Sequence, residues 1–130
     1  MDDRLNILVV EDDPIYAHFV ASTLRQAGHD ISVAFDGRQA REHARTGRPD
    51  AVILDLGLPD ESGYDVARAL RGGILDADAV IILLTANQYP ERDTAEAVGI
   101  DMVLSKPIEP ALVGGMIDHV RARRQLRVKR

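Results

Sequence analysis

Acidic residues, a threonine and a lysine follow separate apolar runs of this sequence. They are Glu11, Asp12 and Asp13 after the first run, Asp55 and Thr85 after two later runs, and Lys106 after a weaker run. Crowded carboxylates repel one another, which raises the pKa of at least one of them or calls for a bound cation. Oxygen ligands suit Mg²⁺, and Mg²⁺ beside a lysine suits a phosphoryl group, whose charge both would offset. A carboxylate can also accept a phosphoryl group, and Asp55 is the candidate because it stands alone after a wholly apolar run.

The apolar runs that precede these groups have the pattern of buried β-strands. Three are short and nearly continuous, at residues 5–10, 51–54 and 79–84, and weaker ones lie at residues 31–35 and 101–104. Helical spacing follows each run, in residues 14–27, 37–46, 63–71, 91–98 and 112–120. This alternation predicts an α/β fold with a five-stranded parallel sheet, doubly wound, as a (βα)5 unit. Ligands of such sheets bind beyond the carboxyl ends of the strands, so the polar groups are expected to meet at one rim.

Capping residues predict where the helices begin and end. Asp13 before Pro14 is typical of a helix N-cap, and this structural role explains Asp13 without a metal. The helices are expected to end at Gly28, Gly47, Gly72–Gly73 and Gly99. Structural roles exist for other groups too, since Asp55 could simply end a strand and Lys106 could be a solvated loop charge. The occurrence of a suitable group after each of four strands favours a site.

The composition predicts one domain in a reducing compartment. The chain has 130 residues and no cysteine, which excludes a disulfide framework, a thiolate metal site and a cysteine nucleophile. No apolar stretch reaches the roughly 18 residues of a membrane span, and the N-terminal region lacks a signal peptide, so we expect no membrane span and a cytoplasmic location. The four histidines are scattered and are expected to be exposed or half-buried.

Charge is unevenly placed along the chain. Residues 121–130 hold six basic and no acidic residues, whereas residues 1–120 hold ten basic and 21 acidic residues, a net charge of −11. An acidic body argues on electrostatic grounds against nucleic-acid binding by the domain itself. Residues 1–120 are expected to form the domain, and residues 121–130 a basic helical extension or a linker. Dinucleotide, P-loop and serine-hydrolase motifs are missing.

Taken together, these motifs resemble the receiver domain of two-component response regulators. The similar segments lie between residue 5 and about residue 120 and are Ile7–Pro14, Asp50–Pro59, Ser62–Tyr64, Ile82–Ala86, Gly99 and Ser105–Pro107. Each motif is weak alone, but their order and spacing are specific. The resemblance implies a flavodoxin-like receiver fold. It also implies that Mg²⁺ is held by Glu11, Asp12 (as a direct ligand), Asp55 and the main-chain carbonyl of Gly57.

The resemblance further implies how the domain works. Asp55 would accept a phosphoryl group from a phosphohistidine on a histidine kinase or a histidine phosphotransfer protein, while Thr85 and Lys106 would bind the phosphoryl oxygens. Pro107 would follow a cis peptide bond. Movement of Thr85 would change a protein-binding surface on the fourth and fifth helices, for a downstream effector that the sequence does not identify. Such a domain is not an enzyme, because it catalyses only its own phosphorylation and dephosphorylation.

Three positions depart from the family pattern. Val103 stands where the family usually has a Tyr or Phe that reorients with the threonine, and Gly57 stands where a larger side chain influences dephosphorylation. Asn87 is a small amide at another position that modulates the phosphoryl lifetime. These departures leave a pseudo-receiver, a constitutive protein-interaction module, as the alternative. A phosphatase is disfavoured, because Gly57 replaces the second aspartate that such hydrolases use. The sequence does not distinguish a stand-alone receiver from part of a longer protein.

Overall fold

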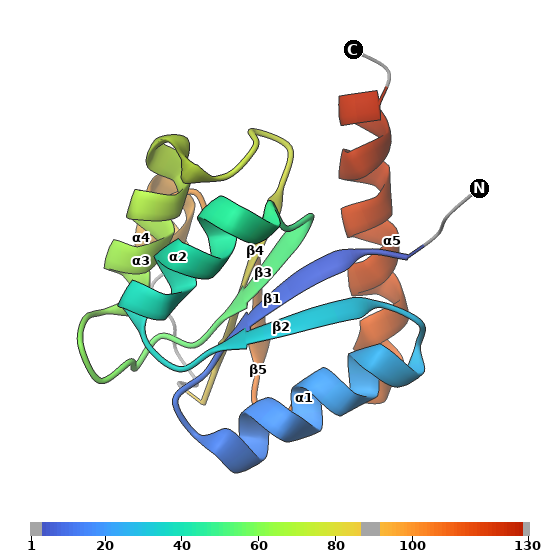
Figure 1. Ribbon diagram of the computed structural model, residues 1–130, viewed down its shortest axis with the longest axis horizontal. Coiled ribbons are helices and arrows are strands. Elements are labelled where there is room, and N and C mark those ends of the chain that lie inside the picture. The colour runs from blue at the N-terminus through green and yellow to red at the C-terminus, as the bar shows by residue number, and fades with distance from the viewer. Residues whose placement is uncertain (1–3, 87–91, 129–130) are drawn as a thin grey trace.

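Strands and helices alternate along the chain in the computed structural model, which describes residues 4–86 and 92–128 (Figure 1). The elements are β1 (Asn6–Val10), α1 (Pro14–Gln26), β2 (Asp30–Ala34), α2 (Gly37–Gly47), β3 (Ala51–Leu54), α3 (Gly63–Ala69), β4 (Val80–Thr85), α4 (Arg92–Ala97), β5 (Met102–Ser105) and α5 (Pro110–Val128). A π-helical turn, Leu70–Ile74, continues α3. The predicted strand–helix alternation is therefore confirmed, with small shifts at the ends of most elements, whereas α5 continues past the predicted end at residue 120 to Val128.

The strands form one parallel sheet in the order β2-β1-β3-β4-β5. The register pairs Val10 at the end of β1 with Leu54 at the end of β3. It also pairs Thr85 at the end of β4 with Ser105 at the end of β5. Because the strands all run in the same direction, their carboxyl ends lie along one rim, and the strand order reverses between β1 and β3. The doubly wound fold is confirmed, and this rim is where the site was predicted.

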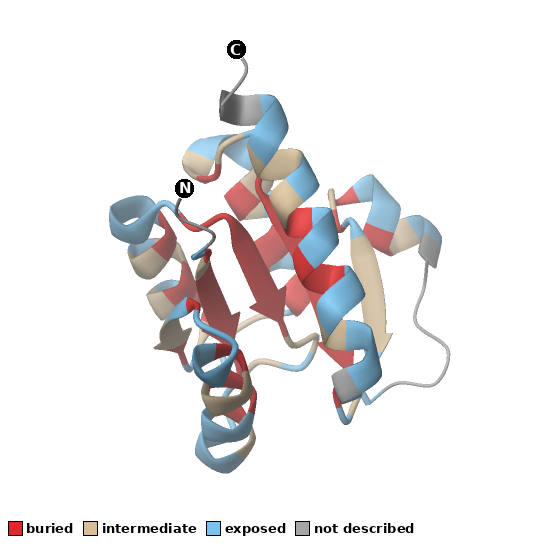
Figure 2. Cartoon of the chain, turned by 90° about the vertical axis from the view of Figure 1, so that its right-hand side faces the viewer, coloured by how far each residue is buried: buried red, intermediate tan, exposed pale blue. Residues whose placement is uncertain are grey.

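Helices cover both faces of the sheet, with α1 and α5 on one face and α2, α3 and α4 on the other (Figure 1). Side chains alternate along each strand. Leu8 and Val10 therefore enter the apolar cluster beneath α2 and α3, whereas Ile7 and Val9 enter the cluster beneath α1 and α5. Figure 2 shows the central strands buried between helices whose outer faces are exposed. Two apolar clusters, one on each face, thus fix the strands whose ends carry the polar groups.

Local signals explain where the helices begin and end. Asp13 is the N-cap of α1 as predicted, and its carboxylate accepts a hydrogen bond from the Ile15 N–H at 3.0 Å. The predicted end of α2 is wrong by one residue, because Gly47 belongs to the helix and Arg48 takes the left-handed conformation (φ 45°). Pro49 follows, and a residue before proline is driven away from the right-handed helical region. The chain therefore leaves the helix at Arg48.

Helix α5 runs without a break from Pro110 to Val128, and its last turns project past the sheet (Figures 1 and 2). Arginines in its second half contact other parts of the fold. Arg123 Nη1 lies 3.3 Å from Asp101 Oδ1, and Arg124 Nη1 donates to the Arg4 carbonyl at 2.7 Å. The role of residues 121–130 as an extension or a linker stays a prediction. Within residues 4–86 and 92–128, neither α5 nor a shorter helix is long and apolar enough to span a membrane.

His29 contradicts the expectation that the histidines are exposed or half-buried. Its residue is only 6% exposed, and its Nδ1 accepts a hydrogen bond from the Leu5 N–H at 3.1 Å. Burial lowers the pKa of His29, and the positive charge of Arg121 acts in the same direction. The imidazole thus satisfies a buried backbone donor just before β1 begins. A lone histidine in a polar stretch does not reveal this role in the sequence.

Candidate functional site

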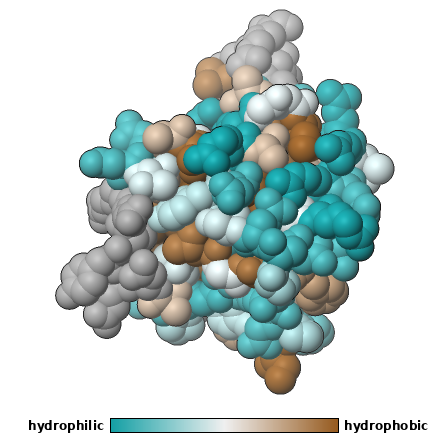
Figure 3. Space-filling view, turned by 90° about the vertical axis from the view of Figure 1, so that its left-hand side faces the viewer, coloured by the Kyte–Doolittle hydropathy of each residue, from teal (hydrophilic) through white to brown (hydrophobic). Residues whose placement is uncertain are grey.

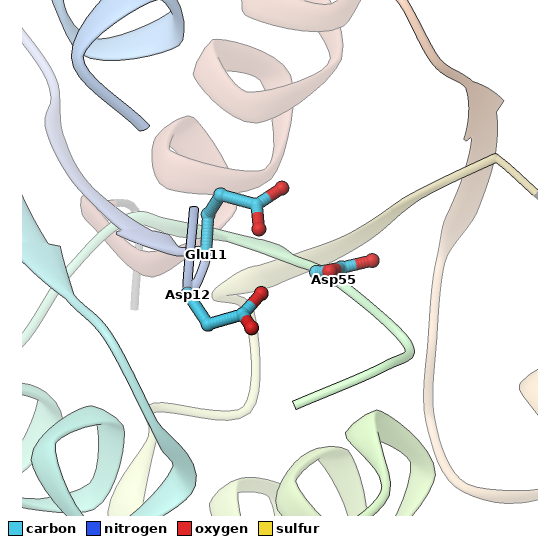
Figure 4. A group of neighbouring side chains, drawn as sticks. All are labelled: Glu11, Asp12 and Asp55. Atoms are coloured by element: carbon cyan, nitrogen blue, oxygen red, sulfur yellow. The ribbon is translucent and has the colours of Figure 1, made fainter. Parts of the chain in front are cut away.

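Three carboxylates meet at the rim where β1 and β3 end. Glu11 and Asp12 follow β1, and Asp55 follows β3, the neighbouring strand. Backbone hydrogen bonds extend the sheet into the site, since the Asp55 N–H donates to the Val10 carbonyl and the Glu11 N–H donates to the Ala34 carbonyl, both at 3.0 Å. One oxygen of each carboxylate lies within 4.8 Å of the others. Figure 4 shows the three side chains around a common space, so the structure brings these predicted residues together.

The three carboxylates differ in their surroundings. Glu11 is buried, Asp55 is partly buried and Asp12 is exposed. Burial raises the pKa of Glu11 and the charge of Asp55 adds to the effect, although hydrogen bonds from Lys106 and from the Asp13 N–H oppose it. The cluster therefore holds an excess of negative charge that a cation would offset. Hard carboxylate oxygens, with an exposed side open to water, fit Mg²⁺.

Lys106 brings an ammonium group into the same space. Its Nζ donates to Glu11 Oε1 and lies 3.4 Å from Asp55 Oδ2. Burial would lower the pKa of Lys106, but the hydrogen bond to Glu11 and the charge of Asp55 outweigh it and raise the pKa. The ammonium also lies 4.8 Å from the centroid of the Tyr16 ring, a contact that the sequence analysis did not predict. A positive charge beside Asp55 can offset negative charge that builds up on that carboxylate or on a group bound to it.

Thr85 and Lys106 are placed by adjacent strands. Thr85 ends β4, is 4% exposed and is paired in register with Ser105. The Lys106 N–H donates to the Thr85 carbonyl at 2.9 Å, so the chain after β5 stays attached to the end of β4. The bond between Lys106 and Pro107 is cis, as the resemblance implied. Thr85 therefore lies one strand away from Asp55 on the same rim.

Gly57 and Val103, the two described positions that depart from the family pattern, lie in different surroundings. Gly57 is exposed and forms an isolated antiparallel bridge with Ser62 in the loop after β3. Open space surrounds it, since a Cβ there would meet nothing within 4 Å. Val103 is partly buried in β5 and packs against the cluster beneath α2 and α3. Asn87, the third departure from the family pattern, lies outside the described residues.

The loop after β3 is anchored to the start of α2 by two acidic residues that the sequence analysis missed. The Asp60 carboxylate accepts hydrogen bonds from the Gly37 N–H at 2.9 Å and the Arg38 N–H at 3.2 Å. These bonds, that from Gly37 above all, lower the pKa of Asp60. Glu61 pairs with both terminal nitrogens of Arg41, and one of these contacts is 2.7 Å long. A second acidic pair five residues after Asp55 was the available signal, but the sequence does not name its partners.

Gly63 lets the start of α3 approach the backbone of Asp55 closely. The Gly63 N–H donates to the Leu56 carbonyl at 2.8 Å, and Ser62 caps the helix by accepting from the Tyr64 N–H. A Cβ on Gly63 would lie 2.8 Å from Leu56 Cα and 3.2 Å from the Asp55 carbonyl carbon. A side chain at this position would therefore push against the backbone that carries Asp55.

The surface on the side toward which β1 and β3 run is mixed in character. Figure 3 shows its hydrophobic residues in several separate groups among hydrophilic ones. Ile15 and Phe19 on α1 and Phe35 after β2 are among the exposed large hydrophobic residues, with exposures of 83%, 49% and 41%. The rim therefore presents both charge and apolar contact area.

Comparison with known proteins gives consistent sequence matches. Residues 7–118 match the family model of the response regulator receiver domain. The chain is 41% identical over 125 residues to the DNA-binding response regulator MtrA of Mycolicibacterium smegmatis, a match that covers 92% of this chain and 50% of that protein. It is 35% identical over 114 residues to the aerobic respiration control sensor protein ArcB of Escherichia coli, covering 87% of this chain and 15% of that protein. The chain thus spans about half the length of the MtrA relatives it matches.

Solved structures with significant sequence identity share the fold. The receiver domain of the sensor histidine kinase PA1611 from Pseudomonas aeruginosa, with a magnesium ion coordinated in its active site cleft, superposes with a TM-score of 0.79 at 31% identity, covering 88% of this chain and 95% of that chain. The chemotaxis protein CheY4 of Vibrio cholerae superposes with a TM-score of 0.83 at 30% identity, covering 90% and 98% of the two chains.

Proposed function

Because the chain belongs to the response regulator receiver domain family, we propose that it is a phosphoacceptor of a two-component phosphorelay. It would take a phosphoryl group from a phosphohistidine of a histidine kinase or histidine phosphotransfer protein onto Asp55. The observation that carries the proposal is the Asp55 carboxylate itself, partly exposed at the rim, with two other carboxylates within 4.8 Å and the Lys106 ammonium 3.4 Å away. A nucleophile, a cation-binding set and a fixed positive charge thus occupy one place.

Each residue of the site has a role in the proposed transfer. An oxygen of Asp55 attacks the phosphorus, a new O–P bond forms, the P–N bond to the donor histidine breaks, and the released imidazole keeps its electron pair and takes up a proton. Lys106 offsets the negative charge on the transferring oxygens. Glu11, Asp12, Asp55 and the carbonyl of Gly57 would hold Mg²⁺, which when bound supplies further positive charge to those oxygens.

Thr85 connects the site to the rest of the domain in this proposal. Its hydroxyl would bind a phosphoryl oxygen, and the movement would shift the backbone near α4 and change a protein-binding surface on α4 and α5. The effector of this surface and a cytoplasmic location stay predictions. The protein would catalyse only its own phosphorylation and dephosphorylation. The pseudo-receiver alternative gains no support, because the acidic cluster and Lys106 that phosphorylation would need lie together in the site.

Intact-mass measurement tests the proposed function. Incubation with acetyl phosphate and Mg²⁺ should add about 80 Da, the mass of one phosphoryl group less a proton. Asp55→Asn should abolish the adduct because the nucleophile is lost. Asp13→Asn is the matched control, since Asp13 caps α1 through the Ile15 N–H, and an asparagine keeps that cap. Absence of an adduct with both acetyl phosphate and a phosphohistidine donor would overturn the proposal.

A further inference from the structure

We propose that Tyr16 is a positioning residue that holds the Lys106 ammonium beside Asp55 through contacts of both its ring and its hydroxyl. The inference rests on the proposed phosphoacceptor function. It adds Tyr16 on α1, which lies outside the segments on which the resemblance to the family rests and about 90 positions from the lysine along the chain. A lysine on a flexible four-carbon stem needs such restraint to keep one position.

The ring gives the ammonium a third contact besides the two carboxylates. Lys106 Nζ lies 4.8 Å from the centroid of the Tyr16 ring, within the roughly 6 Å range of a cation–π contact. Its remaining described contacts are with Glu11 and Asp55. The lysine side chain is only 21% exposed, so little water competes with these contacts. The ring therefore adds to the contacts that restrict the position of the ammonium.

The hydroxyl of the same residue holds the chain just after the lysine. The Ile108 N–H donates to the Tyr16 hydroxyl oxygen at 3.0 Å. Ile108 is 5% exposed and belongs to the cluster beneath α1 and α5. One side chain thus contacts the lysine and the backbone two residues later, which ties the loop after β5 to the start of α1.

Tyr16 is itself held in place. It lies in the first turn of α1, next to Asp13 and Pro14 at the start of the helix. Its ring centroid lies 6.0 Å from that of Phe19, with the planes inclined by 31°. A cavity of about 10 Å³, lined by Tyr16, Glu11 and Asp55 among others, lies behind the site. This is about the smallest space that holds one water, so little room is left for the Tyr16 ring to move on the side of Glu11 and Asp55.

Three variants separate the contacts. Tyr16→Phe keeps the ring and removes the hydroxyl, whereas Tyr16→Leu removes both. Phe19→Leu is the control on the same helix, because leucine keeps an apolar side chain against the Tyr16 ring, while the described contacts of Lys106 do not include Phe19. We expect Tyr16→Leu to slow phosphorylation by acetyl phosphate about fivefold, as loss of a partly buried cation–π contact predicts. Phe19→Leu should stay within about twofold of the wild type, and Tyr16→Phe should lie between the two.

An NMR measurement reports the position of the lysine without reference to activity. The side-chain methylene protons of Lys106 near the ring should be shifted upfield in the wild type, in Tyr16→Phe and in Phe19→Leu. The shift should disappear in Tyr16→Leu. The Lys106→Arg spectrum assigns these signals.

The outcomes keep the two proposals apart. Absence of the upfield shift in the wild type, or its persistence in Tyr16→Leu, would overturn the placement of Lys106 by Tyr16. If the wild type shows the expected upfield shift but Tyr16→Leu is phosphorylated as fast as the wild type, the positioning role would be overturned. A wild-type protein that forms no adduct would refute the phosphoacceptor function, while the NMR result would still decide whether Tyr16 holds the lysine.

Discussion

Replacing Gly63 with alanine should disturb the acidic site through the backbone of Asp55. The added Cβ would lie 2.8 Å from Leu56 Cα, and ordinary carbon contacts are about 3.5 Å, so the two groups must separate by roughly 0.7 Å. The obstacle is the backbone of Asp55 and Leu56, with the Asp55 carbonyl oxygen nearest, so no side-chain rotation relieves it. Overpacking of this kind costs about 1–3 kcal/mol, while alanine in a helix returns up to about 1 kcal/mol. We expect a net loss of about 1–2 kcal/mol.

Thermal unfolding and Mg²⁺ titration measure this effect. In a domain of this size, the loss corresponds to a decrease in Tm of about 3–10 °C. Mg²⁺ demands near-ideal ligand geometry, so its affinity should fall by about threefold or more. Gly115→Ala is the control, since Gly115 lies inside α5 and a Cβ there meets nothing within 4 Å. This control should keep or raise the Tm. A Gly63→Ala protein with wild-type Tm and Mg²⁺ affinity would refute the reasoning.

Charge and protonation at three other positions give further tests. Lys106→Met removes the ammonium from beside Glu11 and Asp55. Mg²⁺ should then bind more tightly, by about tenfold, while phosphorylation slows at least about tenfold. Weaker Mg²⁺ binding in a calorimetric titration would contradict this expectation. The lowered pKa of Asp60 means that its contribution to stability is present above the ordinary pKa of 3.8 and is lost as pH falls through the folded-state value. Asp60→Asn should therefore destabilise the protein by about 1 kcal/mol at neutral pH and lose stability less steeply than the wild type below about pH 4, as urea unfolding at each pH would show. The lowered pKa of His29 affects stability in a higher pH range than that of Asp60. The reason is that the unfolded chain takes up a proton near pH 6.5, whereas the folded protein resists protonation there. Wild-type stability should then fall from about pH 7 to pH 5, and His29→Asn should reduce that fall; equal slopes would exclude His29 as the cause.

Much of the fold is predictable because the central strands carry an unambiguous pattern. β3 and β4 are buried at every position, and their apolar runs leave no alternative to a doubly covered strand. The edge strands β2 and β5 are only partly buried, which explains why their sequence signals are weaker. The end of α2 was misplaced because a glycine signal and a proline signal lie two residues apart, and the proline restricts Arg48.

The sequence predicted which side chains meet at the rim, but not which other residues hold them in place. Parallel strands with adjacent ends bring Asp12, Asp55 and Lys106 to one rim, and the structure shows this convergence. Their roles in phosphoryl transfer stay proposals. The contact of Tyr16 with Lys106 depends on the directions of two side chains far apart in sequence, and so does the anchoring of Asp60 to α2. Spacing along the chain carries no information about such directions.

The division of the interior by the sheet has a consequence for how this domain can change. Every apolar strand residue packs either on the α1 and α5 side or on the α2, α3 and α4 side, so the two halves of the interior share the sheet but no apolar side chain of a strand. Substitutions that repack one half need no compensation in the other, because distant sites without common partners act nearly additively. Each half can therefore accumulate substitutions that suit its own binding partners. A displacement of the sheet by either half would reach the acidic rim, because the strands that carry the acidic residues belong to both halves.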